Sequence, residues 1–441
     1  MVARARRVAV GVLSRIERDG AWATPTLDTE INRAGLERVD AALATQIVYG
    51  ALRVRPSLEA VVEGYANRPV KVDPWTHAAL LAGAFQLLHL SRVPSHAVVD
   101  DSVSLVREKR GSRVAGFVNA VLRKVARQRP VDAELPASIV LPDWLDKALR
   151  VALGDADTEA LLRLSGDATT TDVRVPERSH LQDVADSIRE AHPDASVART
   201  RLSARGLRMT RVGDPRRLAA YERGEIAVQE EGAQLIGAIV DAKPGDRVLD
   251  VCAGRGGKTV QLVEAVGPTG EVVATDVHAR RLSQIPEELS RLGLPTSTLR
   301  TATVDWTVGP GEVSGTFDRV LIDAPCTGLG TLRRRPEILL RADPALPAQM
   351  GETQLRILER AAARVRPGGT LVYAVCSPLP EEGFDVVSRA SLPAFQPAKV
   401  ARFGLNSERV GTTPSIRLGP FVEGAGPWAD AYQVSVWVNV G

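Results

Sequence analysis

Residues 1–135 carry a helical pattern of apolar and polar positions. Within 39–53 the apolar side chains that share one helical face are Leu43, Ile47, Val48 and Leu52. Within 114–127 the corresponding face is formed by Phe117, Val118, Val121, Leu122 and Val125. Almost no alternating, strand-like pattern occurs in this region. The pattern therefore predicts one all-α bundle.

The regular helical pattern is lost after this region. Residues 129–144 are rich in proline and predict a linker. Residues 145–235 mix short strand patterns, such as 169–175 and 206–212, with helical patterns such as 180–191. This mixture predicts a small α+β connector domain.

Residues 236–441 alternate apolar strand patterns with helix-length segments. The strand patterns fall at 246–253, 270–277, 298–306, 317–325 and 369–377. Strands separated by helices predict a doubly wound, Rossmann-like α/β domain with a mostly parallel sheet. The chain is thus expected to be multidomain, with a bundle, a connector and an α/β domain.

Bulk composition is that of an ordinary globular protein. Of the 441 residues, 44% are hydrophobic and 25% are charged. The most apolar window, 77–90, is too short to span a bilayer, so no membrane association is expected. Three cysteines are too few for a disulfide framework and favour a reducing, cytoplasmic location.

Positive charge is concentrated in one part of the predicted bundle. Between Ser104 and Pro130 a single acid, Glu108, stands among eight basic residues, a local balance of +7, although the whole chain carries only +3. The eight are Arg107, Lys109, Arg110, Arg113, Arg123, Lys124, Arg127 and Arg129. On charge alone a solvated helix face is the simpler interpretation. A surface for nucleic-acid phosphates is the alternative, and it needs support from elsewhere in the chain.

Polar residues with chemical potential end five of the predicted strands. In an open parallel sheet, ligands bind outside the carboxyl ends of the strands. The residues at those ends are Asp250 to Lys258, Asp276, Asp305, Asp323 to Cys326, and Cys376. Five such endings predict a ligand site at this edge.

The glycine-rich stretch 252–259, "CAGRGGKT", follows the first of these strands. A phosphate-binding P-loop needs glycine where Cys252 stands, and a dinucleotide fingerprint needs glycine where Thr259 stands. We therefore predict a tight strand-to-helix turn whose backbone amides a ligand can approach. At the next strand end, Asp276 could accept hydrogen bonds from both hydroxyls of a ribose, which favours a nucleoside site.

The three cysteines most simply pack as small buried side chains. Other roles are poorly supported, because only one of six histidines, His278, lies in this domain and no cysteine–histidine pair has metal-ligand spacing. A disulfide between Cys326 and Cys376 is geometrically conceivable but disfavoured in a reducing compartment.

The motifs "LDVCAGRGGKT", "DAPCTGLG…RRRPEI" and "LVYAVCSPLPEE" resemble the Sun/Nop2 group of RNA cytosine-5 methyltransferases. The stretch 229–235, "QEEGAQL", resembles a further motif of that group. "ATQIVYGALR" and "FVNAVLRKV" are similar to the NusB-like RNA-binding domain of its RsmB-type members, so the resemblance covers nearly the whole chain. Departures occur at Gly254-Arg255, where the group has Ala-Pro, and at Gly383, where it has Asn.

The resemblance implies a methyltransferase that uses S-adenosylmethionine on an RNA cytosine, with 16S rRNA as the expected RNA. It assigns Cys376 as the nucleophile that adds to cytosine C6, Cys326 as the residue that helps release the product, and Asp323 as a partner of the base. The implied cofactor-binding residues are Cys252, Ala253, Gly254, Arg255, Gly256, Gly257, Lys258, Asp276, Asp305 and Asp323. A monomer without metal, made of residues 1–135, 145–235 and 236–441 as separate domains, is expected.

Two other functions stay open at this point. A DNA cytosine-5 methyltransferase would use a Pro-Cys pair such as Pro325-Cys326 as its nucleophile, which leaves Cys376 unexplained; tRNA is a further alternative substrate. A non-catalytic RNA-binding or assembly factor would be expected to lose a strand-end acid or a cysteine, and none is lost.

Overall fold

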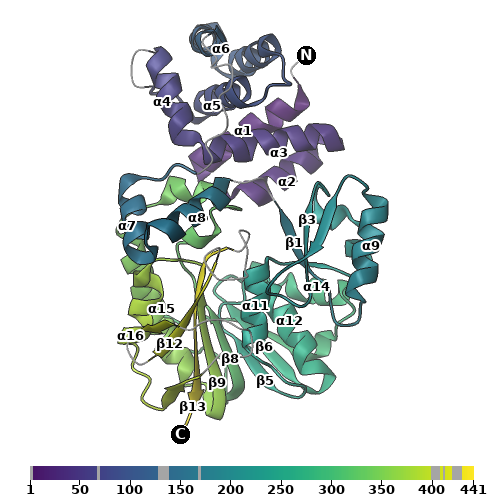
Figure 1. The fold of residues 1–441 in the computed structure, drawn as a ribbon, viewed down its shortest axis with the longest axis vertical. Helices are drawn as coiled ribbons and strands as arrows, with labels where there is room; N and C mark the ends of the chain where they lie inside the picture. Colours follow the sequence, from purple (N-terminus) through teal and green to yellow (C-terminus); the bar gives the residue numbers. More distant parts are fainter. Residues whose placement is uncertain are drawn as a thin grey trace. The chain divides into compact units, whose positions relative to one another are not determined.

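The computed structural model describes residues 3–66, 70–127, 139–166, 170–398, 408–410, 413–419 and 430–441. Arg129 and Pro130, at the end of the basic stretch, and the predicted boundary at residue 135 lie outside these ranges. The chain divides into two compact units: Met1–Asp143 with Ser165–Asp167 and Leu332–Arg341, and the remainder of the chain. Figure 1 draws the helices and strands of both units.

The first unit is a helical bundle, as the apolar pattern predicts. Its helices are α1 (Arg4–Asp19), α2 (Ala23–Ala34), α3 (Arg38–Arg53), α4 (Arg55–Ala66), α5 (Pro74–His89) and α6 (Ser95–Arg127). Helix α5 begins at the N-cap Asp73, whose carboxylate accepts from the backbone N–H of Trp75 and Thr76, and it is buried along most of its length. Helix α3 approaches it closely at Gly50, where an added Cβ would lie only 2.0 Å from the Phe85 ring. A small residue is therefore needed at this crossing.

Helix α6 carries the basic stretch on its exposed side. It bends at Gly111, whose φ of 79° is not helical. Lys109 lies with Nζ 3.4 Å from the centre of the Trp75 ring, and Arg110 is 2.9 Å from the Asp73 carboxylate. Beyond the bend, Arg123 and Arg127 are exposed to solvent.

The segment Leu332–Arg341, which follows a strand of the α/β domain in the sequence, belongs to the helical unit. Its Glu337 is 1% exposed and accepts a hydrogen bond from the first N–H of α2, at Ala23, at 2.9 Å. The guanidinium of Arg341 lies 4.3 Å from the centre of the Trp22 ring. The "RRRPE" motif thus helps to build the bundle, a role that its sequence does not indicate.

The second unit begins with two helices, α7 (Asp143–Leu153) and α8 (Asp155–Gly166), in a region where the sequence indicates only a linker and mixed structure. A four-stranded antiparallel sheet follows, in the order β2-β3-β1-β4. Its elements are β1 (Thr171–Arg174), α9 (Leu181–Ala191), β2 (Ser196–Arg199), β3 (Gly206–Thr210) and β4 (Ala227–Val228). Apolar side chains of α9 pack on one face of this sheet, among them Val184 and Ile188.

A nine-stranded sheet forms the centre of the second unit. Its parallel part contains β5 (Arg247–Asp250), β6 (Glu271–Asp276), β7 (Leu299–Thr303), β8 (Phe317–Asp323) and β9 (Val365–Val375), in the order β9-β8-β5-β6-β7. Antiparallel strands extend it beyond β9: β10 (Phe395–Pro397), β11 (Glu408–Val410), β12 (Thr413–Leu418) and β13 (Tyr432–Asn439). The predicted fold class is confirmed, although the sequence pattern does not predict β13.

Helices cover both faces of this sheet, as Figure 1 shows. One face packs against α11 (Glu231–Ile239), α12 (Gly257–Val266) and α14 (Ile285–Arg291), and the other against α15 (Leu346–Ala362) and α16 (Phe384–Arg389). Alternate residues of β5 supply the two cores, with Val248 in one and Leu249 in the other. A sheet buried on both faces fixes where its strands end, which positions the site. No helix among the residues described here is long and apolar enough to cross a membrane.

Candidate active site

The carboxyl ends of β5, β8 and β9 meet at one edge of the central sheet. These strands are paired in parallel, with Asp250 opposite Leu321 and Asp323 opposite Ala374. A cavity of about 120 Å³ opens at this edge, lined by Gln229, Ala233, Asp250, Cys252, Ala253, Gly257, Lys258 and Asp323. The cavity therefore brings together five of the predicted site residues, namely Cys252, Ala253, Gly257, Lys258 and Asp323.

The two predicted catalytic cysteines face each other. The Sγ atoms of Cys326 and Cys376 are 3.2 Å apart, and the two cysteines are not joined in a disulfide. The hydrogen bond with Cys376, together with burial, raises the pKa of Cys326 well above its ordinary value.

An ion pair lies in the wall of the cavity. Lys258, from the first turn of α12, places its Nζ 2.5 Å from Oδ2 of Asp323, at the end of β8. Burial alone would lower the pKa of Lys258, but the attraction of Asp323 outweighs it and the pKa is raised. The cavity therefore presents a fixed positive charge and a carboxylate as one unit.

The glycine loop is the tight strand-to-helix turn that its sequence predicts. It leaves β5 at Asp250 and enters α12 at Gly257. Gly256 has a φ of 84°, and an added Cβ would lie 2.7 Å from Ile285, so only glycine fits there. The side chain of Arg255 is exposed at the tip of the turn.

Asp276 supports the glycine loop from the end of β6. Its Oδ2 accepts from the N–H of Gly254 at 3.1 Å and its Oδ1 accepts from the N–H of His278 at 2.8 Å. Asp305, beyond β7, is exposed and accepts from the hydroxyl and N–H of Thr307. Seven predicted site residues do not line the cavity: Gly254, Arg255, Gly256, Asp276, Asp305, Cys326 and Cys376.

Gln229, Ala233 and Asp250 also line the cavity. The sequence predicts Asp250 as a strand-end residue of the ligand site and gives no role to the other two. Asp250 is 1% exposed; its Oδ2 accepts from Thr259 Oγ1 at 2.7 Å, while its Oδ1 has no partner in the described part of the chain. Burial raises its pKa to about 7. Gln229 Oε1 is likewise buried without a partner among the described residues. The resemblance of "QEEGAQL" to a family motif was the one sequence signal that pointed to Gln229.

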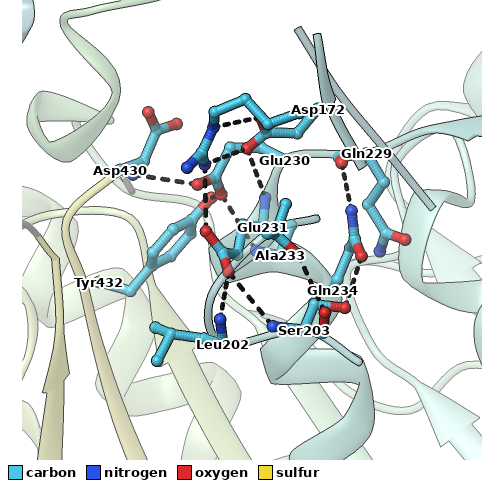
Figure 2. A network of polar contacts seen from close by, with 12 residues as sticks. Asp172, Leu202, Ser203, Gln229, Glu230, Glu231, Ala233, Gln234, Asp430 and Tyr432 are labelled. Atoms are coloured by element: carbon cyan, nitrogen blue, oxygen red, sulfur yellow. Dashed lines mark hydrogen bonds and ion pairs between the residues drawn. The ribbon is translucent and has the colours of Figure 1, made fainter. Parts of the chain in front are cut away.

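A buried polar network holds this segment in place, as Figure 2 shows. Glu230 caps α11 by accepting from the N–H of Ala233 at 3.1 Å, and it also accepts from Tyr432 Oη at 2.9 Å. Arg208 joins Asp172 of β1 to Glu231 through contacts of 2.8 and 3.1 Å. The network links the four-stranded sheet, α11 and β13. Within it, Gln234 Nε2 donates to the carbonyl of Gln229, which fixes Gln229 at the cavity.

Across the ranges that the structure describes, no group of three or more His, Cys, Asp and Glu side chains could hold a metal ion.

Comparison with known protein families gives two matches along the chain. Residues 238–421 match the model of the 16S rRNA methyltransferases RsmB/F, and residues 3–127 match that of the NusB family. The first range contains the cysteines and the glycine loop, and the second covers the helical bundle.

Relatives match over most of the chain. The ribosomal RNA small subunit methyltransferase B of Vibrio vulnificus is 33% identical over 81% of this chain and 84% of its own. The Pseudomonas syringae protein of the same name is 32% identical, covering 87% and 85%. Among solved structures, PH0851 superposes with a TM-score of 0.83 at 21% identity, covering 100% of this chain and 99% of its own. The structure of NSun6 from Pyrococcus horikoshii, solved with SFG, superposes with a TM-score of 0.60 at 16% identity. The match covers 68% of this chain and 99% of that structure.

Proposed function

We propose, from the premise that this chain belongs to the RsmB/F family of 16S rRNA methyltransferases, that it methylates C5 of a cytosine in RNA with S-adenosylmethionine as the donor. The proposed RNA is 16S rRNA, which the name of the matched family specifies. One observation carries the cytosine-5 chemistry: the thiols of Cys326 and Cys376 lie 3.2 Å apart at the ends of neighbouring strands.

Two thiols suit this reaction because C5 of cytosine is a poor nucleophile. When the Cys376 thiolate forms a bond to C6, the electron pair of the C5–C6 double bond moves to C5, which can then take the methyl group. Removal of the C5 proton restores the double bond and expels the thiolate from C6. We assign the release step to Cys326. After its thiol has lost its own proton to solvent, the Cys326 thiolate takes the C5 proton, which returns Cys326 to the thiol while Cys376 leaves C6 as the thiolate. The raised pKa of Cys326 makes its thiolate a stronger base for this proton.

Asp323 and Lys258 are proposed to hold the cytosine ring. The Asp323 carboxylate would accept a hydrogen bond from N3–H of a ring protonated at N3, and so favour the form that is activated for addition. Lys258 orients this carboxylate through the 2.5 Å contact between its Nζ and Oδ2 of Asp323. The target base must be unpaired or flipped out, since a stacked base cannot reach a cavity at a sheet edge.

The site has features that fit S-adenosylmethionine, which supplies the methyl group when bound. Asp250 Oδ1 and Gln229 Oε1 are buried acceptors without a partner in the described residues, and a ligand ammonium group would satisfy both. The backbone of Cys252 to Lys258, with Asp276 and Asp305, is proposed to bind the nucleoside part. The NSun6 structure contains SFG, an analogue of this cofactor, which supports the proposal.

Replacing Asp276 with alanine should weaken binding of S-adenosylmethionine by about 1.5–3 kcal/mol, the range for hydrogen bonds to a charged group. Part of this weakening comes from the ribose hydrogen bonds and part from the N–H of Gly254, which is left without its acceptor. Isothermal titration calorimetry would measure it, with the exposed Glu287→Ala on α14 as the control. Equal affinity in both variants would count against the role of Asp276.

Removing two exposed cations from α6 should make RNA binding less sensitive to salt. Each phosphate that the protein no longer neutralises lowers the magnitude of the slope of log K against log salt by roughly 0.7–0.9, so Arg123→Ala with Arg127→Ala should lower it by up to about 1.8. A double variant at Arg33 and Arg38, two exposed cations elsewhere in the bundle, is the matched control. If both double variants keep the wild-type slope, the basic face of α6 is only a solvated surface.

The proposed function is tested by bisulfite sequencing of 16S rRNA from a strain that lacks this gene. We expect one cytosine to lose its methyl group and to regain it when the wild-type gene is restored. An unchanged 16S rRNA pattern, with a methyl group missing from tRNA or DNA instead, would move the activity to that nucleic acid.

A further inference from the structure

A single buried carboxylate, that of Glu382, binds the residue that follows each cysteine. Its Oε1 accepts from the N–H of Thr327 and its Oε2 from the hydroxyl of Thr327, both at 2.6 Å. The hydroxyl of Ser377 also donates to this carboxylate. Thr327 follows Cys326 and Ser377 follows Cys376, so Glu382 joins the two cysteine loops.

The loop after β8, which contains Cys326, depends on the Glu382 carboxylate more than the loop that contains Cys376 does. On the other side of Cys326, the carbonyl of Pro325 accepts from Gln354 Nε2 at 2.8 Å. Cys376, by contrast, directly follows β9, and the carbonyl of Ser377 is held independently by Gln433 Nε2 at 2.8 Å. Loss of Glu382 would therefore release the chain on the Thr327 side of Cys326, while Cys376 stays in place.

The environment of Glu382 makes its contacts strong. The residue is 0% exposed, and its own carbonyl accepts from Tyr373 Oη at 2.6 Å, which fixes its backbone. Hydrogen bonds to a charged group are worth more in such a water-free setting than at a surface. Burial raises the pKa of Glu382, and its charge contributes to the raised pKa of Cys326.

We propose that Glu382 is a positioning residue for the methyl-transfer reaction, which holds the Cys326 thiol against Cys376 by anchoring both cysteine loops. Its kinetic consequence rests on the proposed function, because only there does Cys326 act in product release. The claim that Glu382 holds the two thiols close together does not rest on the proposed function, and it can be tested without RNA or cofactor.

The geometric test uses oxidation by diamide, which takes up two protons and two electrons as the thiols of Cys326 and Cys376 form one disulfide bond. Thiols 3.2 Å apart should be joined quickly in the wild-type protein. In Glu382→Ala we expect the rate to fall roughly tenfold or more, since small misplacements of reacting atoms cost that much. Peptide mapping by mass spectrometry identifies the bond. The exposed neighbour Glu381→Ala should react at the wild-type rate.

The kinetic test asks whether Glu382→Ala behaves like a variant without Cys326. With Cys376 in place and Cys326 displaced, a denaturant-resistant protein–RNA conjugate should accumulate. Glu382→Gln, which can still bind Thr327, should restore most of the cross-linking rate and the turnover. If Glu382→Ala does not fold, Thr327→Val takes its place in the test. This variant removes one of the two contacts between Thr327 and Glu382, and we expect it to cross-link at a rate between those of the wild-type protein and a variant without either contact.

The outcomes separate the two proposals. A wild-type disulfide rate in Glu382→Ala, or in Thr327→Val if only that variant folds, would overturn the positioning role. Slow cross-linking with no conjugate in either Glu382→Ala or Cys326→Ala would keep the positioning role and refute the cytosine-5 mechanism. A conjugate in Cys326→Ala but not in a folded Glu382→Ala would overturn the link between Glu382 and product release.

Discussion

Cys326→Ala is expected to leave the protein covalently attached to its RNA, whereas Cys376→Ala should yield neither a conjugate nor a methylated product. Without Cys376 no bond to C6 can form, so C5 is never activated. Without Cys326 the addition and methyl transfer can proceed, but elimination is slow, and the conjugate survives denaturation. Electrophoresis under denaturing conditions with labelled RNA measures both outcomes.

The double variant without either cysteine is the control, and it should form no conjugate if the adduct in Cys326→Ala involves Cys376. The reversed pattern, with a conjugate in Cys376→Ala and an inert Cys326→Ala, would support nucleophilic attack by Cys326, as in the DNA cytosine-5 enzymes. Full activity in both single variants would leave packing as the role of the two thiols.

The second large effect is expected from Asp323→Asn, which should lower kcat by roughly 10²–10³, the loss typical for one preorganised electrostatic contact. The substitution removes the negative charge that would bind the cytosine ring, and it leaves the buried ammonium of Lys258 without an ionic partner. Single-turnover methylation of RNA measures the decrease directly.

A matched control for Asp323→Asn is Asp385→Asn on α16, where the carboxylate is exposed to solvent. It should retain wild-type kcat. A kcat in Asp323→Asn within about threefold of the control would contradict a role for Asp323 in the chemical step, because the decrease expected on removing such a contact is far larger.

The parts of the site that could be predicted from the sequence are those that a strand end determines. Asp323 and Cys376 follow apolar runs that can only be buried strands, and parallel strands deliver their carboxyl ends to one edge. The turn at 252–259 was likewise predictable, because its glycines are needed where φ is positive and where helix α14 approaches.

The parts that could not be predicted depend on contacts between segments distant in the chain. Glu382 lies six residues after Cys376, but its partner Thr327 is 55 residues away, and nothing in "PEE" distinguishes it from the exposed Glu381. Gln229 reaches the cavity because Glu230 is held by Asp430 and Tyr432, about 200 residues further on. Strand β13 adds to the sheet through pairing with β9, and its side chains are nearly all buried, so no alternating pattern marks it.

The most direct measurement of the central claim is nucleoside mass spectrometry of 16S rRNA after reaction with the purified protein and S-adenosylmethionine labelled in its methyl group. The RNA should come from a strain that lacks this gene, and Cys376→Ala should be run in parallel. We predict labelled 5-methylcytidine with the wild-type protein and none with Cys376→Ala. A label on any other nucleoside, or equal 5-methylcytidine from both proteins, would contradict the account.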